Sequence, residues 1–424
     1  MKDTITFINA LVINPEEKTE QLGSLTVEDG KISRIGGPTT GLVIDCKNKC
    51  LAPGIVDMGV NICEPGQRHK ESFKSAGKAA AAGGVTTMVT LPNTTPIIDS
   101  PEMLQFFIRR GKEATDIKVL PTAALTKNLD GKLLTEVGFL TDSGAVAFTE
   151  SNRTVVDTKM FLRALKYVSS HDGLYMGYGQ ESFLQKGAVA TASAFSTKLG
   201  LSAVSELAER IGLQRELSIS EMAEIRYHAN QITTASSVSV IKEIKKTNRR
   251  VTAGTSIHHL TLNDSDIGNY RTFFKLDPPL REENDRQKLL EALVDGHIDT
   301  VSSYHSPQDE ESKRLPFQIA ASGAVGLETL LPAALGLVRD RHMGLSKLFE
   351  VISLNPSKLL RQPTGRIILG APADLILFDM DTTFVLDRSK LFSKSKNTPY
   401  DGIEMQGRVL RTFVNGKQIF QRDP

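Results

Sequence analysis

The feature of this chain that most constrains its fold is a regular alternation of strand-like and helix-like segments between residues 54 and 364. Apolar runs such as VTTMVTLP and IKVLPTAAL alternate with segments such as SPEMLQFFIRRGKEA and DRQKLLEALVDG, in which apolar residues recur with helical spacing. Such alternation predicts parallel βα units. Over roughly 300 residues, the most economical closed arrangement of these units is a (β/α)8 barrel.

The two ends of the chain have a different pattern. Residues 1–53 contain short alternating segments such as TITFINALVI and GSLTVEDGKISRIGG, in which EDG is a hairpin signal. Residues 365–424 return to this pattern with ADLILFDM and GRVLRTFVNGKQIFQ. We therefore expect an α/β protein with a TIM barrel over residues 54–364 and a small composite β domain built from residues 1–53 and 365–424.

The charge balance argues against two classes of partner. Lys plus Arg number 51 and Asp plus Glu number 49, so a formal net charge of +2 gives no basis for binding nucleic acid or an anionic membrane. The sequence has no apolar run of about 18 residues and no N-terminal signal pattern. Its three cysteines form no CxxC pair and are expected to be reduced thiols. The lack of a membrane-spanning run and of a signal pattern, together with the unpaired cysteines, predicts a soluble, cytoplasmic protein.

Several long segments carry a resemblance to one family. They include APGIVDMGVNICEPGQ, TDSGAVAFTE, LDPPLREENDRQKLLEALVDG, IDTVSSYHSPQDE, NPSKLL and GAPADLILFD. In these segments the chain resembles dihydroorotases of the amidohydrolase superfamily. The resemblance covers nearly the whole chain and implies a (β/α)8 barrel of the metal-dependent hydrolase type. In that family zinc makes hydroxide from water and polarises the amide carbonyl of a cyclic dihydropyrimidine.

The resemblance also implies where metal ligands should stand, and this chain departs from the family there. The family has His-x-His after the first barrel strand, two further histidines, and an Asp that acts as ligand and general base. The residues at these places are Gly59, Asn61, Tyr178, Gln231 and Tyr304. Glu150 is the one acid that remains, and one carboxylate alone does not hold zinc. We therefore expect neither a bound metal nor a catalytic residue at these vestigial positions.

The substrate-binding positions that the resemblance implies are altered in part. Cys63 replaces the Arg that grips the substrate carboxylate in the family. Asn93 is retained, either as a substrate contact or as a residue that orders its own loop. His305 matches a neighbour of the missing Asp, and His258 and His259 match a structural pair expected on a strand.

Three functions remain open at this point. The leading one is a non-catalytic dihydroorotase homologue of de novo pyrimidine synthesis, since some bacterial chains that resemble this one serve as non-catalytic subunits that bind aspartate carbamoyltransferase. The resemblance then implies the catalytic chain of aspartate carbamoyltransferase as the partner, and a homo-oligomer or hetero-oligomer as the state of this chain. The second is an active cyclic amidohydrolase with an altered metal site formed by Glu150, His228 and His305. The third is a binding module that uses the vacated pocket for a metabolite.

Overall fold

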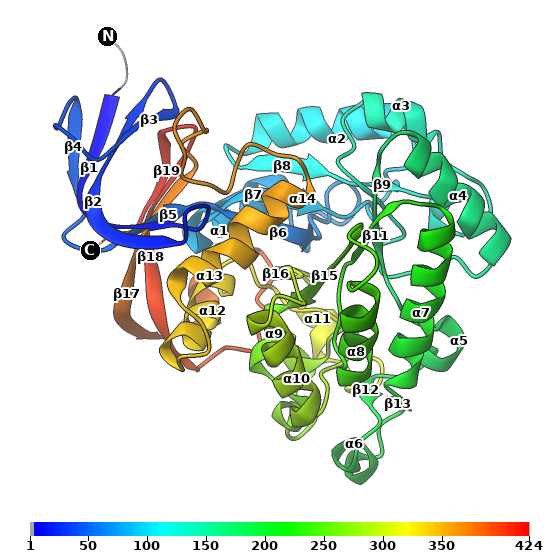
Figure 1. Cartoon of the computed structure of the whole chain (residues 1–424). Coiled ribbons are helices and arrows are strands. Elements are labelled where there is room, and N and C mark those ends of the chain that lie inside the picture. Colours follow the sequence, from blue (N-terminus) through cyan, green and yellow to red (C-terminus); the bar gives the residue numbers. More distant parts are fainter. Residues whose placement is uncertain (1–3, 424) are drawn as a thin grey trace.

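The strand and helix alternation in the middle of the chain builds a closed barrel of parallel strands, as predicted. The computed structural model describes residues 4–423, and Figure 1 shows the barrel beside a separate β sheet. The barrel strands run β6 (Ile55–Val60), β7 (Val85–Thr90), β8 (Lys118–Pro121) continued by β9 (Ala123–Ala124), β10 (Phe148–Thr149), β11 (Leu174–Gly177), β14 (Arg226–Ala229), β15 (Val251–Ser256) and β16 (Thr300–Ser302). Each strand pairs in parallel with the next one in this order.

The barrel closes where its last strand meets its first. The Met58 amide donates a hydrogen bond to Ser302 Oγ at 3.2 Å, and the Asn61 amide donates to the His305 carbonyl oxygen at 2.9 Å. In a barrel of this type the carboxyl ends of the strands all open on one face. Side chains that directly follow different strands therefore come close together in space.

Helices cover the outside of the barrel, and local sequence signals set their ends. Ser72 forms a capping box with Ser75 at the start of α1, and Ser100 caps α2 ahead of Pro101. The helices are α1 (Phe73–Gly83), α2 (Pro101–Ala114), α3 (Val137–Asp142), α4 (Thr158–Ser170), α5 (Ser182–Gln185), α6 (Ala194–Leu199), α7 (Leu207–Met222), α8 (Ala235–Ile244), α9 (Ile257–Thr261), α10 (Glu283–Val294), α11 (Glu310–Arg314), α12 (Leu330–Arg339), α13 (Leu345–Phe349) and α14 (Asn355–Leu359). A short parallel pair, β12 (Ala190–Thr191) and β13 (Ala203–Val204), lies outside the barrel sheet.

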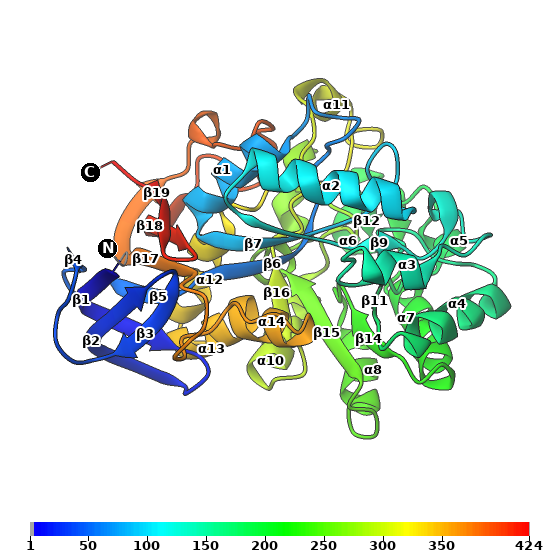
Figure 2. The ribbon, with the colours of Figure 1, turned by 90° about the horizontal axis from the view of Figure 1, so that it is seen from above.

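Strands from both ends of the chain form one sheet beside the barrel. It has the order β19-β18-β17-β5-β1-β2-β3, with β4 paired to β1, and Figure 2 places its blue and red strands side by side. The two halves join where Leu51 of β5 pairs with Leu377 of β17. The strands are β1 (Thr4–Asn14), β2 (Thr19–Glu28), β3 (Lys31–Ile35), β4 (Leu42–Asp45), β5 (Cys50–Pro53), β17 (Leu375–Val385), β18 (Glu404–Val414) and β19 (Lys417–Gln421).

The hairpin predicted at EDG is present. Glu28 pairs with Lys31, and both turn residues, Asp29 and Gly30, have positive φ angles of 49° and 77°. The boundaries at residues 53 and 365 stay a prediction, and residues 1–3 and 424 lie outside the described part of the chain. Within residues 4–423, no helix combines the length and apolarity needed to cross a membrane.

A buried carboxyl links helix α7 to strand β14. Tyr227 donates a hydrogen bond from its hydroxyl to Glu216 Oε2 at 2.8 Å, and both side chains are fully enclosed. Burial raises the pKa of Glu216 to about 7, because the charged form loses its hydration, while the bond from Tyr227 opposes that shift. The folded protein therefore binds this proton more tightly than the unfolded chain does.

This contact predicts a specific dependence of stability on pH. Between pH 4.5, the ordinary pKa of the group, and pH 7, the folded state holds more protons than the unfolded state, so the free energy of unfolding falls as pH rises. We expect Glu216→Gln to remove about 3 kcal/mol of that fall. Urea unfolding across this pH range measures the change, with Glu221→Gln, an exposed position on the same helix, as the control. Identical slopes in wild type and Glu216→Gln contradict the prediction.

Candidate functional site

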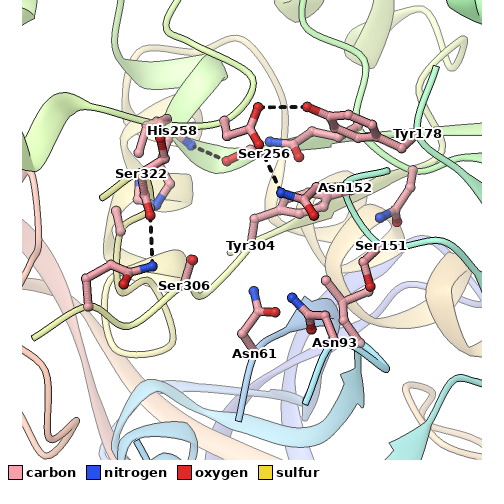
Figure 3. A pocket seen from close by; sticks show the side chains of 18 residues that line it. Asn61, Asn93, Ser151, Asn152, Tyr178, Ser256, His258, Tyr304, Ser306 and Ser322 are labelled. Atoms are coloured by element: carbon pink, nitrogen blue, oxygen red, sulfur yellow. Dashed lines mark hydrogen bonds between the residues drawn. The ribbon is translucent and has the colours of Figure 1, made fainter. Parts of the chain in front are cut away.

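One pocket opens at the carboxyl ends of the barrel strands. It has a volume of about 210 Å³, and Figure 3 shows polar side chains directed into it from several strand ends. Asn61 follows β6, Tyr178 follows β11, Gln231 follows β14 and Tyr304 follows β16, and all four line the pocket. The structure thus brings together four of the five positions that the family resemblance assigns to metal ligands.

Gly59, the fifth position, lies beneath one of these side chains. A Cβ atom at residue 59 would stand 3.0 Å from both Cδ1 and Cε1 of the Tyr304 ring. Gly59 also has a φ of +119°, a conformation that residues with a side chain rarely adopt. The ring of Tyr304 therefore fills the space that a ligand side chain at position 59 would need.

Tyr178 is held in place by a carboxylate that sequence reasoning missed. Its hydroxyl donates to Asp277 Oδ1 at 2.7 Å, and Gln185 Nε2 donates to the same oxygen at 2.9 Å. Asn152 Nδ2 donates to the other oxygen, Oδ2, at 3.1 Å. The network ties together loops that follow β10 and β11 and the segment before α10. Asp277 lies in the segment LDPPLREENDRQKLLEALVDG, which carries part of the family resemblance, but it comes close to Tyr178 only in the folded chain.

Glu150 is directed away from the pocket. Its carboxylate accepts hydrogen bonds from the Thr126 amide at 2.7 Å and from the Thr126 hydroxyl at 3.0 and 2.9 Å. Burial raises the pKa of Glu150 to about 7, although the bonds from Thr126 pull it down. The neighbouring Ser151 lines the pocket, whereas Glu150 does not.

The histidines of the alternative metal site do not meet Glu150. The ring of His228 is buried, with Nδ1 2.9 Å from Thr252 Oγ1 and Nε2 3.4 Å from Thr300 Oγ1. His305 accepts a hydrogen bond at Nδ1 from the Gly326 amide at 3.1 Å. Its Nε2 lies 3.5 Å from Glu71 in the loop before α1, and His305 is not among the residues that line the pocket.

The substrate-binding positions lie around a smaller neighbouring cavity. Cys63 and Asn93 both line it, and Asn93 is exposed and shared with the main pocket. Burial raises the pKa of the Cys63 thiol to about 12, so the thiolate is scarce at neutral pH. Cys63 therefore offers neither the charge of an Arg nor a ready nucleophile.

The structure places His258 and His259 on a different kind of element from the one expected. They were expected on a strand, but His258 and His259 lie on the short helix α9, because Ser256 caps it by accepting from the His258 amide at 3.1 Å. His258 lines the pocket and stacks on Tyr400, with ring centroids 5.5 Å apart. Burial lowers the pKa of His258 to about 3, so its ring is neutral.

The donor set at the barrel mouth does not fit zinc. Zinc takes cysteine, histidine and carboxylate ligands, whereas the positions in question carry glycine, carboxamide and phenol groups. Within residues 4–423, no three His, Cys, Asp or Glu side chains are grouped so that they could hold a metal ion. The residues present therefore disagree with the metal chemistry that the family implies.

The family model and the full-length sequence relatives both point to dihydroorotases. The sequence model described as "Dihydro-orotase-like" matches residues 48–237. A protein named dihydroorotase from Syntrophus aciditrophicus is 36% identical over 417 residues, covering 97% of this chain and 98% of that protein. One of the same name from Ehrlichia chaffeensis is 35% identical, covering 99% of this chain and 96% of that protein.

Solved structures show the same fold. An L-hydantoinase (dihydropyrimidinase) from Arthrobacter aurescens superimposes with a TM-score of 0.90 over 100% of this chain and 97% of its own, at 22% sequence identity. A D-hydantoinase superimposes with a TM-score of 0.86 over 99% of this chain and 95% of its own, at 20% identity. At these identities the likeness establishes the fold alone, a TIM barrel with an attached β domain. The full-length sequence relatives go further, and by them the chain belongs to the dihydroorotase family.

Proposed function

We propose that this chain is a non-catalytic dihydroorotase homologue of pyrimidine biosynthesis. One observation carries the proposal: Tyr304 packs on Gly59 and fills the space where the family resemblance places a metal ligand. Hydrolysis of a cyclic amide at neutral pH needs an activated water molecule, and the family obtains it from zinc. The carboxamides and phenols at this site do not hold that ion.

The titratable side chains at the former ligand positions offer no replacement base. Burial raises the pKa of both Tyr178 and Tyr304 well above the usual range of a phenol, so neither accepts a proton at neutral pH. Glu150 has a suitable pKa of about 7, but Thr126 occupies its oxygens and it does not line the pocket. Among these three side chains, Glu150 alone has a pKa that suits a general base, and its position outside the pocket lining rules it out.

An active enzyme is the second candidate, and the names of the relatives favour it. Proteins called dihydroorotase are 35–36% identical to this chain over nearly its full length. For this candidate, water would have to be activated without the family's ligands. Glu150, His228 and His305 do not form such a site, because each is hydrogen-bonded to a different segment of the chain: Thr126, Thr252 and Gly326.

The partner we propose is the catalytic chain of aspartate carbamoyltransferase. Support comes from the resemblance to bacterial non-catalytic subunits and from a barrel whose last strand is hydrogen-bonded to its first although its metal positions are replaced. A scaffold role needs a stable, folded surface and does not need the ligand set. Oligomers of this chain, alone or with the partner, are part of the same proposal.

A double-mutant cycle tests the packing of Tyr304 on Gly59. Gly59→Ala should lower the free energy of unfolding by about 3 kcal/mol, through collision with the ring and strain at positive φ. In the Tyr304→Ala background, that loss should shrink by at least about 1 kcal/mol, because the collision is gone while the strain remains. Tyr304→Phe keeps the ring and should leave the loss unchanged. Additive effects of Gly59→Ala and Tyr304→Ala in urea unfolding would refute the packing argument.

Metal content and turnover test the lack of catalysis. Purified protein dialysed against zinc should hold far less than one ion per chain and hydrolyse dihydroorotate far below roughly 1 per second. A variant with Gly59→His, Asn61→His, Tyr178→His, Gln231→His and Tyr304→Asp serves as the control for metal uptake. It should bind zinc with little turnover, because Cys63 still replaces the carboxylate-gripping Arg. Stoichiometric zinc with ordinary turnover in the wild type would establish the active enzyme instead.

Co-elution tests the partner. Mixed with the aspartate carbamoyltransferase catalytic chain of the same organism at micromolar concentration, this protein should elute in one larger species whose mass light scattering can measure. The zinc-binding variant should co-elute equally well, because its changes lie inside the barrel mouth. Separate elution of the two chains contradicts the partner while leaving the loss of catalysis intact.

A further inference from the structure

We propose that the outer face of helices α2, α3 and α4 is the surface through which this chain binds an acidic face of its protein partner. The inference deepens the proposed function and rests on it, because that proposal names a partner but no contact surface. Three observations carry it: the close packing of the three helices, an exposed aromatic side chain on each of them, and a group of cations that make no ion pair.

The three helices form one continuous wall. A Cβ atom at Gly138 of α3 would stand 3.0 Å from Cε1 of His171, at the end of α4, and 3.8 Å from the Tyr167 hydroxyl. Just after α3, a Cβ atom at Gly144 would stand 3.3 Å from Cδ1 of Ile108 in α2. Figures 1 and 2 show the three helices one after another on the outside of the barrel, with α4 on the side away from the β sheet of the two termini. Such a preformed surface needs little ordering when it binds.

Each helix presents an exposed aromatic side chain on this wall. Phe139 of α3 is 65% exposed, Phe106 of α2 is 40% exposed and Tyr167 of α4 is 38% exposed. Aromatic residues and arginine are enriched in protein interfaces and among the residues that contribute most to binding. The wall therefore offers an apolar anchor on its middle helix and one on either side.

The charged side chains around these anchors are mostly positive. Helix α4 contains three cations and no acidic residue, α2 contains three cations and two acidic residues, and α3 adds one acid. The whole chain, in contrast, has 51 Lys and Arg residues against 49 Asp and Glu residues. Arg110 is paired with Glu64 at 2.9 Å. The other cations are exposed and, within residues 4–423, make no ion pair: Arg109, Lys112, Lys159, Arg163 and Lys166.

This charge indicates the chemistry of the partner. Cations without local counter-ions attract negative groups over about 8–10 Å at ordinary salt concentration. Arg109 and Lys112, with one acid, Glu113, line a hollow of about 370 Å³ between α2 and the end of α3, which has room for an acidic side chain. Aromatic anchors among cations match a protein surface whose apolar centre is surrounded by Asp and Glu. Acids such as Glu102 and Asp142 among the cations disfavour a uniformly anionic partner such as nucleic acid.

Charge reversal tests the assigned face. The probe is the catalytic chain of aspartate carbamoyltransferase from the same organism, mixed with the full-length protein at micromolar concentration. The triple variant Arg109→Glu, Lys159→Glu and Arg163→Glu should bind it at least tenfold more weakly than the wild type, because attraction becomes repulsion. Raising NaCl from about 50 to about 500 mM should also weaken the wild-type complex, because salt screens these charges.

A matched control makes the same change of net charge elsewhere. It replaces exposed cations on α6, before β15 and after α12, none of which makes an ion pair within residues 4–423, and it should bind as the wild type does. Melting curves show whether both triple variants are folded. The control substitutions are Lys198→Glu, Arg249→Glu and Arg341→Glu.

Phe139→Ala tests the central anchor. It should weaken association about tenfold or more and leave the melting temperature close to that of the wild type, because the side chain is largely exposed in the free chain. Phe183→Ala on α5 is the control, since Phe183 is 73% exposed and lies with Leu207 and Ile211 on a different apolar surface. Loss of association in Phe183→Ala but not in Phe139→Ala would place the interface on α5 and α7 and overturn the assignment.

The outcomes separate this inference from the proposed function. Equal affinity of the wild type and the charge-reversal variant overturns the assigned face and leaves the partner intact. A wild type that does not associate contradicts the partner, and the docking face is rejected with it. Wild-type binding of duplex DNA that the charge-reversal variant loses assigns the face to nucleic acid and overturns the proposal. Association lost in the charge-reversal and Phe139→Ala variants, and kept in both controls, supports the face and the partner together.

Discussion

The packing of the Tyr304 ring over the backbone of Gly59 is the contact on which the rest of the site depends. It lies at the seam where β16 meets β6, two residues before Asn61 and one before His305. A side chain at residue 59 and a ring at residue 304 exclude one another at a separation of 3.0 Å. The two positions are therefore coupled, and a return to a ligand side chain at one requires a change at the other.

Around this contact, the side chains at the barrel mouth differ from the metal ligands that the family resemblance implies. Phenols, hydroxyls and carboxamides line the space, and Asp277 supplies acceptors that fix Tyr178 and Asn152. The acids that remain nearby are bound within the wall, as Glu150 is by Thr126. The result is a polar cavity whose shape is set by hydrogen bonds between loops rather than by coordination to an ion.

The sequence predicted the parts of this arrangement that depend on local pattern. The alternation after residue 54 predicted the barrel, and EDG predicted the β2–β3 hairpin. The family resemblance assigned Tyr178, Gln231 and Tyr304 to former ligand positions on different strands, and these three residues line one pocket.

What could not be predicted depends on pairs of residues far apart in the chain. Asp277 and Tyr178 are separated by 99 positions, and no motif joins them. The direction of the Glu150 side chain depends on Thr126, and the helix at His258 depends on a cap that looked like the end of a strand. Such partners become known only when the fold is known.

The pairing of β5 with β17 has a consequence for how the chain reaches its fold. Leu51 can pair with Leu377 only after residue 377 has been synthesised, so the edge of β5 that pairs with β17 stays unpaired until then. Contacts between such distant residues slow folding, because a long loop must close before they form. The sheet is complete only when β5 and β17, from the two ends of the chain, have paired. Loss of the final strands would therefore expose the first ones, and a truncated product should aggregate even though its barrel segment is complete.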